Sequence, residues 1–119
     1  MRSHRRRLPT EHVLLAGDLG DVVAIEAALA WLPADAYGQV LVEAGADDAL
    51  PLFRAPLRVT VHRIRRSAEG HGVAAGRAVA AWVEEWMPDE PDERRLVSIW
   101  VGQRVEPGCP HISALVERL

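Results

Sequence analysis

The sequence predicts an α/β domain in which a mostly parallel sheet of about four strands lies between two layers of helices. Short apolar runs alternate along the chain with segments of helical period, an order typical of β-α-β units. The apolar runs are nearly continuous, as expected for parallel strands that are buried on both faces. Because β-α-β crossovers are right-handed, few topologies remain, and we interpret the chain as a small Rossmann-like three-layer sandwich.

The first β-α-β unit is predicted within residues 12–42. The apolar run 13–16 is a buried strand, which Gly17 and Asp18 close. Asp18 or Gly20 suits the N-cap of the helix that follows, and Pro33 with the residues after it ends that helix. A second strand covers 40–42. The helix is placed by apolar residues at spacings of three, four and three: Val22, Ile25, Leu29 and Leu32.

The rest of the chain continues the alternation with longer loops. A second long helix is placed by apolar residues at spacings of four, three and four: Ala75, Val79, Trp82 and Trp86. The other predicted elements are a strand at 57–61, a basic and glycine-rich loop at 62–72, an acidic linker at 89–93, a strand at 96–101 and a terminal helix at about 112–118. We assign Trp31, Trp82 and Trp86 to packing. Trp100 suits either a buried strand position or stacking on a planar ligand.

Composition and length indicate one ordinary domain of 119 residues. The chain is 49% hydrophobic and 26% charged, which excludes wholesale disorder. We expect residues 1–11, with four arginines, to be a flexible basic arm and residues 12–119 to be a single domain. A lone cysteine, Cys109, fits a reducing compartment. No apolar run approaches the roughly 20 residues of a membrane span, and no apolar segment follows the basic start, so we expect a cytoplasmic protein without membrane association.

The candidate binding residues lie where the predicted strands end. In open parallel sheets, ligands bind beyond the carboxyl ends of the strands, where the strand order reverses. That rule brings four loops to one rim: 17–20, 44–45, 62–63 and 102–103. The turn from Gly17 to Gly20 can direct backbone N–H groups toward a phosphate, or it can simply turn the chain and cap a helix. Arg63, with Arg65 and Arg66, can grip a phosphate, or form an ordinary basic loop.

Several other functions lack a matching pattern. Cys109 and His111 are separated by one residue, which is not a structural zinc spacing, so we expect no metal. No Ser-His-Asp pattern, paired catalytic carboxylates or P-loop is visible, and we assign no catalytic residue. The arginines at 2–7 could touch nucleic acid, but the net charge of -3 and the absence of interleaved aromatic residues argue against that partner.

Four segments carry a family resemblance over about residues 11–105. Residues 12–18 read HVLLAGD and residues 29–43 read LAWLPADAYGQVLVE. Residues 59–63 read VTVHR and residues 99–103 read IWVGQ. In order and spacing they resemble the AGD, LPADARG, VLLEV, LHR and WVAGE segments of siderophore-interacting proteins, in their carboxy-terminal domain. Members of that family are flavin- and NAD(P)H-dependent ferric-siderophore reductases.

The resemblance implies NAD(P)H as the cofactor. Its site would be flanked by Gly17, Asp18, Arg63 and Gly102, with Arg63 at the adenosine phosphate. The family continues the AGD with a Glu-Thr-Ala type of sequence where the nicotinamide meets the sheet, whereas residues 19–21 read LGD. The family's closing Tyr-Trp-Arg-Gly-like segment and amino-terminal flavin barrel have no counterpart in the sequence. FAD is therefore expected only on a separate partner.

Two functions from different classes stay open. The first is a stand-alone domain that binds NAD(P)H or another nucleotide and serves iron-siderophore reduction with a flavin-domain protein. On this hypothesis the chain alone is not a complete enzyme, because electrons pass from hydride to iron through a relay such as flavin. The second is a non-catalytic interaction or assembly module, which keeps the fold without the cofactor and docks on a partner or on copies of itself.

Overall fold

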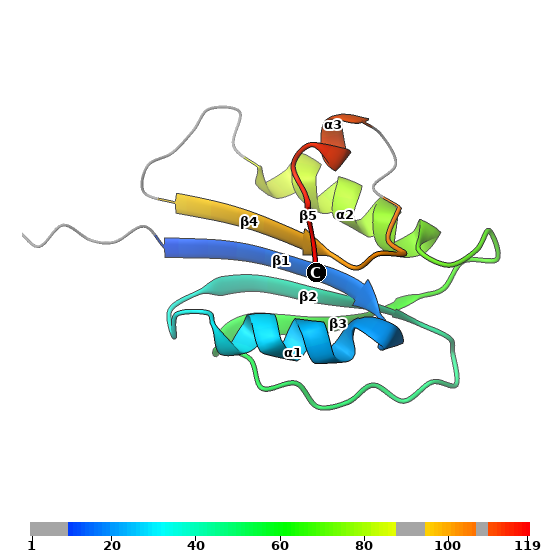
Figure 1. The fold of residues 1–119 in the computed structure, drawn as a ribbon, viewed down its shortest axis with the longest axis horizontal. Coiled ribbons are helices and arrows are strands. Elements are labelled where there is room, and N and C mark those ends of the chain that lie inside the picture. Colours follow the sequence, from blue (N-terminus) through cyan, green and yellow to red (C-terminus); the bar gives the residue numbers. More distant parts are fainter. Residues whose placement is uncertain (1–9, 88–94, 107–109) are drawn as a thin grey trace, which may run out of the picture.

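The structure is a computed structural model that describes residues 10–87, 95–106 and 110–119 (Figure 1). The predicted acidic linker and Cys109 lie outside these residues. The elements, in chain order, are β1 (Thr10–Asp18), the 3-10 turn η1 (Leu19–Asp21), α1 (Val22–Ala30), β2 (Tyr37–Ala44), β3 (Arg58–Arg65), α2 (Val73–Trp86), β4 (Arg95–Val101), α3 (Pro110–Ser113) and β5 (Glu117–Arg118). Within the described residues, no helix is long and apolar enough to cross a membrane.

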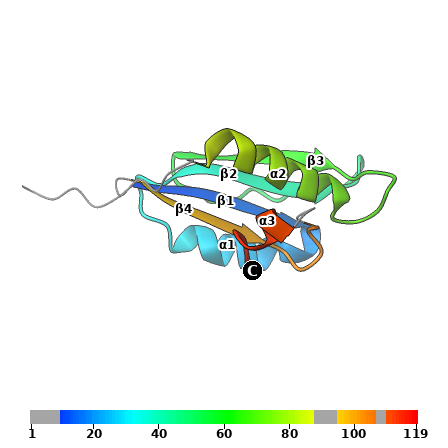
Figure 2. The same cartoon turned by 90° about the horizontal axis from the view of Figure 1, so that it is seen from above.

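The sheet confirms the predicted fold class. Its strand order is β3-β2-β1-β4-β5, and all the pairings are parallel. It has five strands rather than about four. The helices α1 and α2 lie on opposite faces of this sheet, which makes three layers (Figure 2). The chain builds outward from β1 through β2 to β3 and then returns to the other side of β1, so the strand order reverses between β1 and β4.

The core has two halves, one on each face of the sheet. Successive side chains of a strand point to opposite faces. On β1, Val13 and Leu15 accordingly pack with Ile25 and Leu29 of α1. Leu14 and Ala16 belong to the other cluster, with residues of α2 such as Val79 and Trp82. All four β1 side chains are buried, which explains why the run 13–16 is apolar without alternation.

The predicted cap at Asp18 belongs to the 3-10 turn η1, whereas the N-cap position of α1 itself is Asp21. Asp18 Oδ1 accepts a hydrogen bond from the Gly20 N–H at 2.8 Å, and Asp21 Oδ2 accepts one from the Asp18 N–H at 2.9 Å. These reciprocal bonds form a capping box around η1, which leads directly into α1. The α1 helix ends at Ala30, before Pro33.

Two strand boundaries differ from the prediction. β1 begins at Thr10, so residues 10–11 belong to the sheet rather than to the predicted arm, and residues 1–9 lie outside the described residues. β3 runs from Arg58 to Arg65, which places His62 and Arg63 in the strand rather than in a loop. Edge strands tolerate charged side chains, and most of β3 is exposed, so its polar composition resembles that of a loop.

The predicted terminal helix at 112–118 is wrong beyond Ser113. Glu117 and Arg118 pair with Trp100 and Val101 as β5. Arg118 Nη1 also donates to the carbonyl oxygens of Gly102 at 2.6 Å and Val105 at 3.0 Å. These long-range bonds to β4 and the loop after it replace the local helical bonds that the sequence pattern suggested.

The tryptophans take different environments. Trp82 is buried at 4% exposure, as predicted, whereas Trp86 is 41% exposed and meets the His12 ring edge-on. Trp31 is 89% exposed, so its assignment to packing is wrong. Because α1 ends at Ala30, Trp31 lies beyond the helical stripe. Trp100 is half-buried and packs on the same face of the sheet as α1.

Candidate functional site

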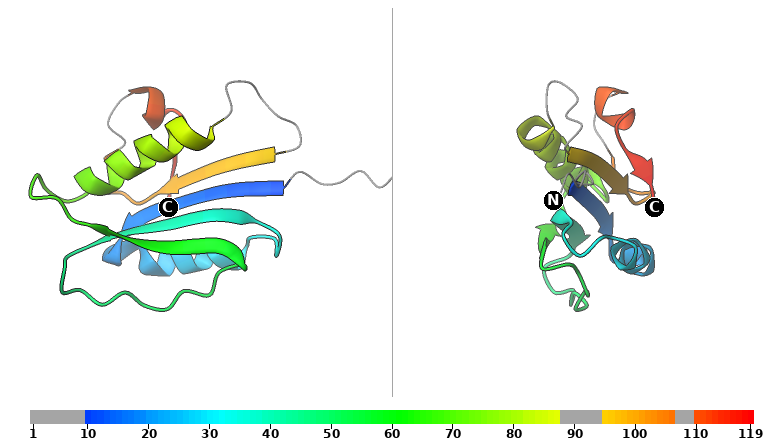
Figure 3. Two further views of the ribbon diagram at one scale, coloured as in Figure 1. Left: turned by 180° about the vertical axis from the view of Figure 1, so that it is seen from behind. Right: turned by 90° about the vertical axis from the view of Figure 1, so that its left-hand side faces the viewer.

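The carboxyl ends of β1 to β4 meet at one rim of the sheet, as the parallel pairing requires (Figure 3). At the reversal of strand order, Ala16 of β1 pairs with Val101 of β4, and the Gly102 N–H donates to the Ala16 carbonyl oxygen at 2.8 Å. The next residues along the chain, Gly17 within β1 and Gly102 directly after β4, are therefore neighbours. We call this junction between β1 and β4 the switch point.

The switch point is filled by the carboxylate of Asp21. A Cβ added to Gly17 would lie 2.7 Å from Asp21 Oδ2, and a Cβ added to Gly102 would overlap the same oxygen. Both glycines thus leave room for one carboxylate, which the capping bond from the Asp18 N–H holds in place. The nearby hollow on the α2 side, which Gly17, Asp18 and Arg104 help to line, is too small for a water-sized sphere.

Charge at the switch point comes from three side chains. Arg104 Nη1 lies 2.9 Å from Asp18 Oδ2 in an ion pair, of which the Asp18 side chain is 9% exposed and the Arg104 side chain 65%. Burial raises the pKa of Asp21 above its ordinary value of 3.8, and the adjacent Asp18 carboxylate raises it further, while the Asp18 N–H and Arg104 oppose the rise. With all three groups ionised, two negative charges face one positive charge.

Glu43 is a polar residue that the sequence reasoning did not single out as functional. Its side chain is 1% exposed, and its two oxygens accept hydrogen bonds from the Gly72 N–H at 2.8 Å and the Ala75 N–H at 2.9 Å. It therefore caps the amino end of α2 from the end of β2, beside Asp18 of β1. The only signal was a glutamate at the end of an apolar run.

Arg63 lies two strands from β1, about 10 Å away at ordinary strand spacing. Its guanidinium donates to the carbonyl oxygen of Gly45 at 2.6 Å and to that of Asp48. The side chain thereby holds the loop that follows β2. The structure brings Gly17, Asp18 and Gly102 together and leaves Arg63 at the outer part of the same rim. That these four residues flank a cofactor stays a prediction.

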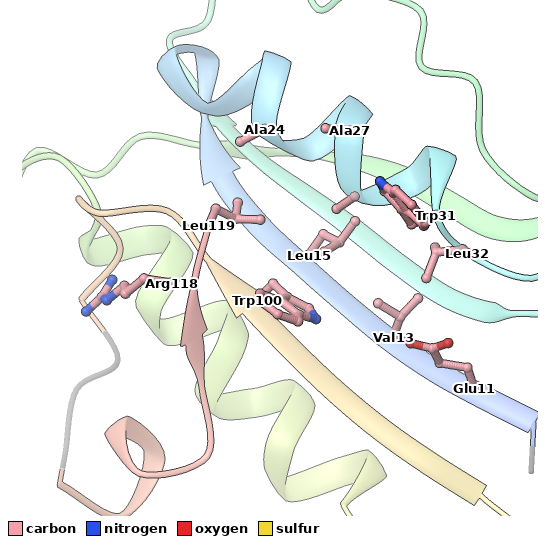
Figure 4. Close-up of a pocket in the computed structure, with 11 residues that line it drawn as sticks. Glu11, Val13, Leu15, Ala24, Ala27, Trp31, Leu32, Trp100, Arg118 and Leu119 are labelled. Atoms are coloured by element: carbon pink, nitrogen blue, oxygen red, sulfur yellow. The ribbon is translucent and has the colours of Figure 1, made fainter.

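A separate apolar groove lies on the α1 face, away from the rim (Figure 4). Its volume is about 450 Å³. It runs between α1 and the β4–β5 side of the sheet, with Trp31 on one side, Trp100 on its floor and Glu11 at one end. The other lining residues are Val13, Leu15, Ala24, Ala27, Ala28, Leu32, Arg118 and Leu119. This groove contains none of the predicted cofactor residues.

Comparison with solved structures shows the same fold in three bacterial proteins. The siderophore-interacting protein SipS from Aeromonas hydrophila aligns with a TM-score of 0.56 and 24% identity, over 79% of this chain and 38% of its own. A siderophore utilization protein from T. fusca gives 0.55 and 22%, over 76% and 33%. The siderophore-interacting protein from Acinetobacter baumannii gives 0.51 and 14%, over 83% and 38%. The chain thus spans about a third of the length of these structures.

No curated protein matches the chain. The family model described as "Siderophore-interacting protein" matches residues 10–103, which run from the first residue of β1 to the second residue after β4. This range holds the strands β1 to β4, both long helices and all four predicted cofactor residues. The resemblance found in the sequence is confirmed: the chain belongs to the siderophore-interacting protein family.

Proposed function

We propose that this chain is a pyridine-nucleotide domain, which binds NAD(P)H at the carboxyl rim and works with a flavin domain on a second chain in ferric-siderophore reduction. The observation that carries the proposal is the reversal of strand order between β1 and β4, with Gly17 and Gly102 facing each other there. Membership of the siderophore-interacting protein family supports the same function.

One part of this rim suits a dinucleotide and another part does not. Arg63 and Arg65 at the end of β3 form a basic group, which suits an adenosine phosphate. A phosphate at Arg63 would share its guanidinium with the carbonyl oxygens of the loop after β2. At the switch point, however, the Asp21 carboxylate occupies the space that a phosphate would enter. In the conformation described, the pyrophosphate does not fit, so binding requires Asp21 to move. The flavin partner would take hydride from NAD(P)H and pass single electrons to iron, one NAD(P)H reducing two ferric ions.

Thermal unfolding with added nucleotides tests the proposal. A ligand at about a hundred times its Kd stabilises a protein by about 2.7 kcal/mol. Millimolar NADPH or NADH should therefore raise the Tm by several degrees, and AMP or FAD serve as comparisons. No shift with any of the four nucleotides would refute the proposal.

A matched pair of arginine variants tests the role of Arg63. Arg63→Gln should weaken NADPH binding about tenfold and leave NADH binding nearly unchanged, because only NADPH carries the extra phosphate. Arg54→Gln removes an exposed arginine that is not among the predicted cofactor residues. It should change the affinity for neither nucleotide. Equal losses for both nucleotides would mean that Arg63 acts only through the loop it holds.

A second candidate function is an assembly module, which the 89% exposure of Trp31 beside the apolar groove favours. Large exposed apolar patches mark interaction sites. If a second copy covers this groove, the protein should sediment as a dimer, and Trp31→Ser should shift it toward monomer. Val23→Ser on α1, the helix that Trp31 follows, is the control, because Val23 is 81% exposed and does not line the groove. A monomer at every concentration would exclude this assembly.

A further inference from the structure

At the switch point, the carboxylate of Asp21 takes the place that a bound phosphate would occupy. Asp21 Oδ2 accepts the hydrogen bond of the Asp18 N–H, a backbone donor of the kind that binds phosphate at the turn between a strand and a helix. The same oxygen lies against both Gly17 and Gly102, the two positions where the absence of a Cβ lets another group come close to the sheet. A carboxylate therefore occupies both the donor and the space of a bound phosphate.

We propose, on the basis of the proposed function, that Asp21 is a specificity-determining residue: while ionised, it weakens the binding of phosphate groups at the switch point, and its neutralisation or removal strengthens that binding. Two effects act together. The carboxylate fills the space between the glycines, and its charge repels an incoming phosphate. Asp18 does not take this role, because its own oxygens are engaged by the Gly20 N–H and by Arg104.

The charged groups around Asp21 fix the direction of the effect. Asp18 at the end of β1 is paired with Arg104 from the loop after β4, so these two charges nearly cancel. Glu43, on the neighbouring strand β2, turns its carboxylate to the amino end of α2 and lies 3.8 Å from Arg66 Nε. Asp21 thus supplies the uncompensated negative charge at the switch point. Since burial and Asp18 raise its pKa, acid should neutralise it before an ordinary exposed aspartate.

Titration with inorganic pyrophosphate, in buffer with a chelator so that no metal bridges the two anions, tests the inference. Asp21→Ala should bind pyrophosphate at least about tenfold more tightly than the unmodified protein near neutral pH. Asp21→Asn should recover only part of this gain, because the amide still fills the space. Asp35→Ala, which removes an exposed carboxylate at the opposite end of the sheet, controls for net charge and should have little effect.

Two further measurements separate specific binding from a change in structure. The factor by which Asp21→Ala binds pyrophosphate more tightly than the unmodified protein should become smaller as the pH falls from about 7.5 to about 5. In Asp21→Ala the Asp18 amide proton should exchange faster with solvent, and pyrophosphate should restore its protection. Equal pyrophosphate affinity in the two proteins, or no renewed protection of that amide, would overturn the inference.

The outcomes distinguish this inference from the proposed function when NADPH is titrated alongside. If Asp21→Ala gains pyrophosphate binding but no variant binds a nucleotide, the inference stands and the proposed function fails. If the unmodified protein binds NADPH and Asp21→Ala binds neither ligand more tightly, the proposed function stands and the inference fails. If Asp21→Ala gains affinity for both ligands, both stand.

Discussion

Two pairs of glycines in this fold have different kinds of neighbours. Gly72 and Gly76 at the start of α2 are so close to the chain after β4 that an added Cβ would overlap the backbone carbonyl groups of Arg104 and Glu106. Gly17 and Gly102 at the switch point face one side chain, Asp21: a Cβ added to either would meet its carboxylate, and a Cβ on Gly17 would also lie 2.8 Å from Asp21 Cβ. The first pair is closed by backbone, which cannot withdraw without moving an element. The second is closed mainly by a carboxylate, which can rotate away while its Cβ stays beside Gly17.

The difference separates a packing contact from a candidate site. A glycine against backbone fixes the distance between two elements, here α2 and the loop that follows β4. A glycine against a flexible side chain leaves a space that can change its occupant. By this criterion the structure favours the switch point as the place where a ligand could enter, although the larger apolar groove lies elsewhere.

The largest effect is expected from Gly76→Ala. The new methyl group would overlap the Glu106 carbonyl, so α2 or the chain after β4 must shift, and the free energy of unfolding should fall by about 3 kcal/mol. Urea unfolding measures it. Gly45→Ala is the control, since its Cβ would meet only the Asp48 carboxylate, at 3.0 Å. If the two variants lose equal stability, the backbone contact is not what makes Gly76 sensitive.

Glu43→Gln tests the other fixed contact of α2. The amide retains one acceptor oxygen but turns an NH₂ group toward a backbone N–H, so one buried donor loses its partner. The expected loss is about 2 kcal/mol, measured by urea unfolding. Glu85→Gln, on the exposed side of the same helix, should cost less than about 0.5 kcal/mol. An unchanged free energy of unfolding in Glu43→Gln would show that α2 needs no carboxylate cap.

A smaller, conditional effect is expected from Gly102→Ala. Its methyl group would displace the Asp21 carboxylate, at a cost of about 1 kcal/mol in the free energy of unfolding. In the Asp21→Ala background that cost should nearly vanish, and a double-mutant cycle measures the coupling. Additive losses would show that the backbone, and not Asp21, limits the space at Gly102.

The smallest effect concerns pH. The pKa of Asp21 is higher in the folded protein than its ordinary value of 3.8, so the proton is bound more tightly in the folded state. The stability linked to this group is therefore full at low pH and is lost as the pH rises through the raised pKa. Relative to Asp21→Asn, the unmodified protein should lose less than about 1 kcal/mol between about pH 4 and pH 7. If the free energy of unfolding changes with pH by the same amount in the unmodified protein and in Asp21→Asn, this prediction is contradicted.

Local patterns predicted most of the fold. The continuous apolar runs located β1, β2 and β4, and Asp18 was recognised as a cap because capping depends on the next few residues only. β5 and the end of β3 were missed because edge strands are made by pairing with distant residues and have little apolar signal of their own.

The candidate site was predicted only in part, for the same reason. The rim and its glycines follow from the order of strands and helices. The position of Asp21 does not, because its side chain meets Gly102 only after β1 pairs with β4 from the far end of the chain. The sequence shows that Asp21 places a carboxylate at the Gly17–Gly20 turn, where it disfavours a phosphate, but not that this carboxylate reaches Gly102. Arg63 likewise appeared as part of a basic loop until pairing with β2 placed it in a strand.

The exposed position of Trp31 has a practical consequence. An indole in water emits at longer wavelength than one in an apolar environment, and Trp31 is nearly fully hydrated while Trp82 is buried. The protein thus carries an intrinsic fluorescent reporter on the groove, separate from the switch point. A blue shift on adding a candidate partner would report that Trp31 has left water, whereas a ligand at the rim would not bury Trp31.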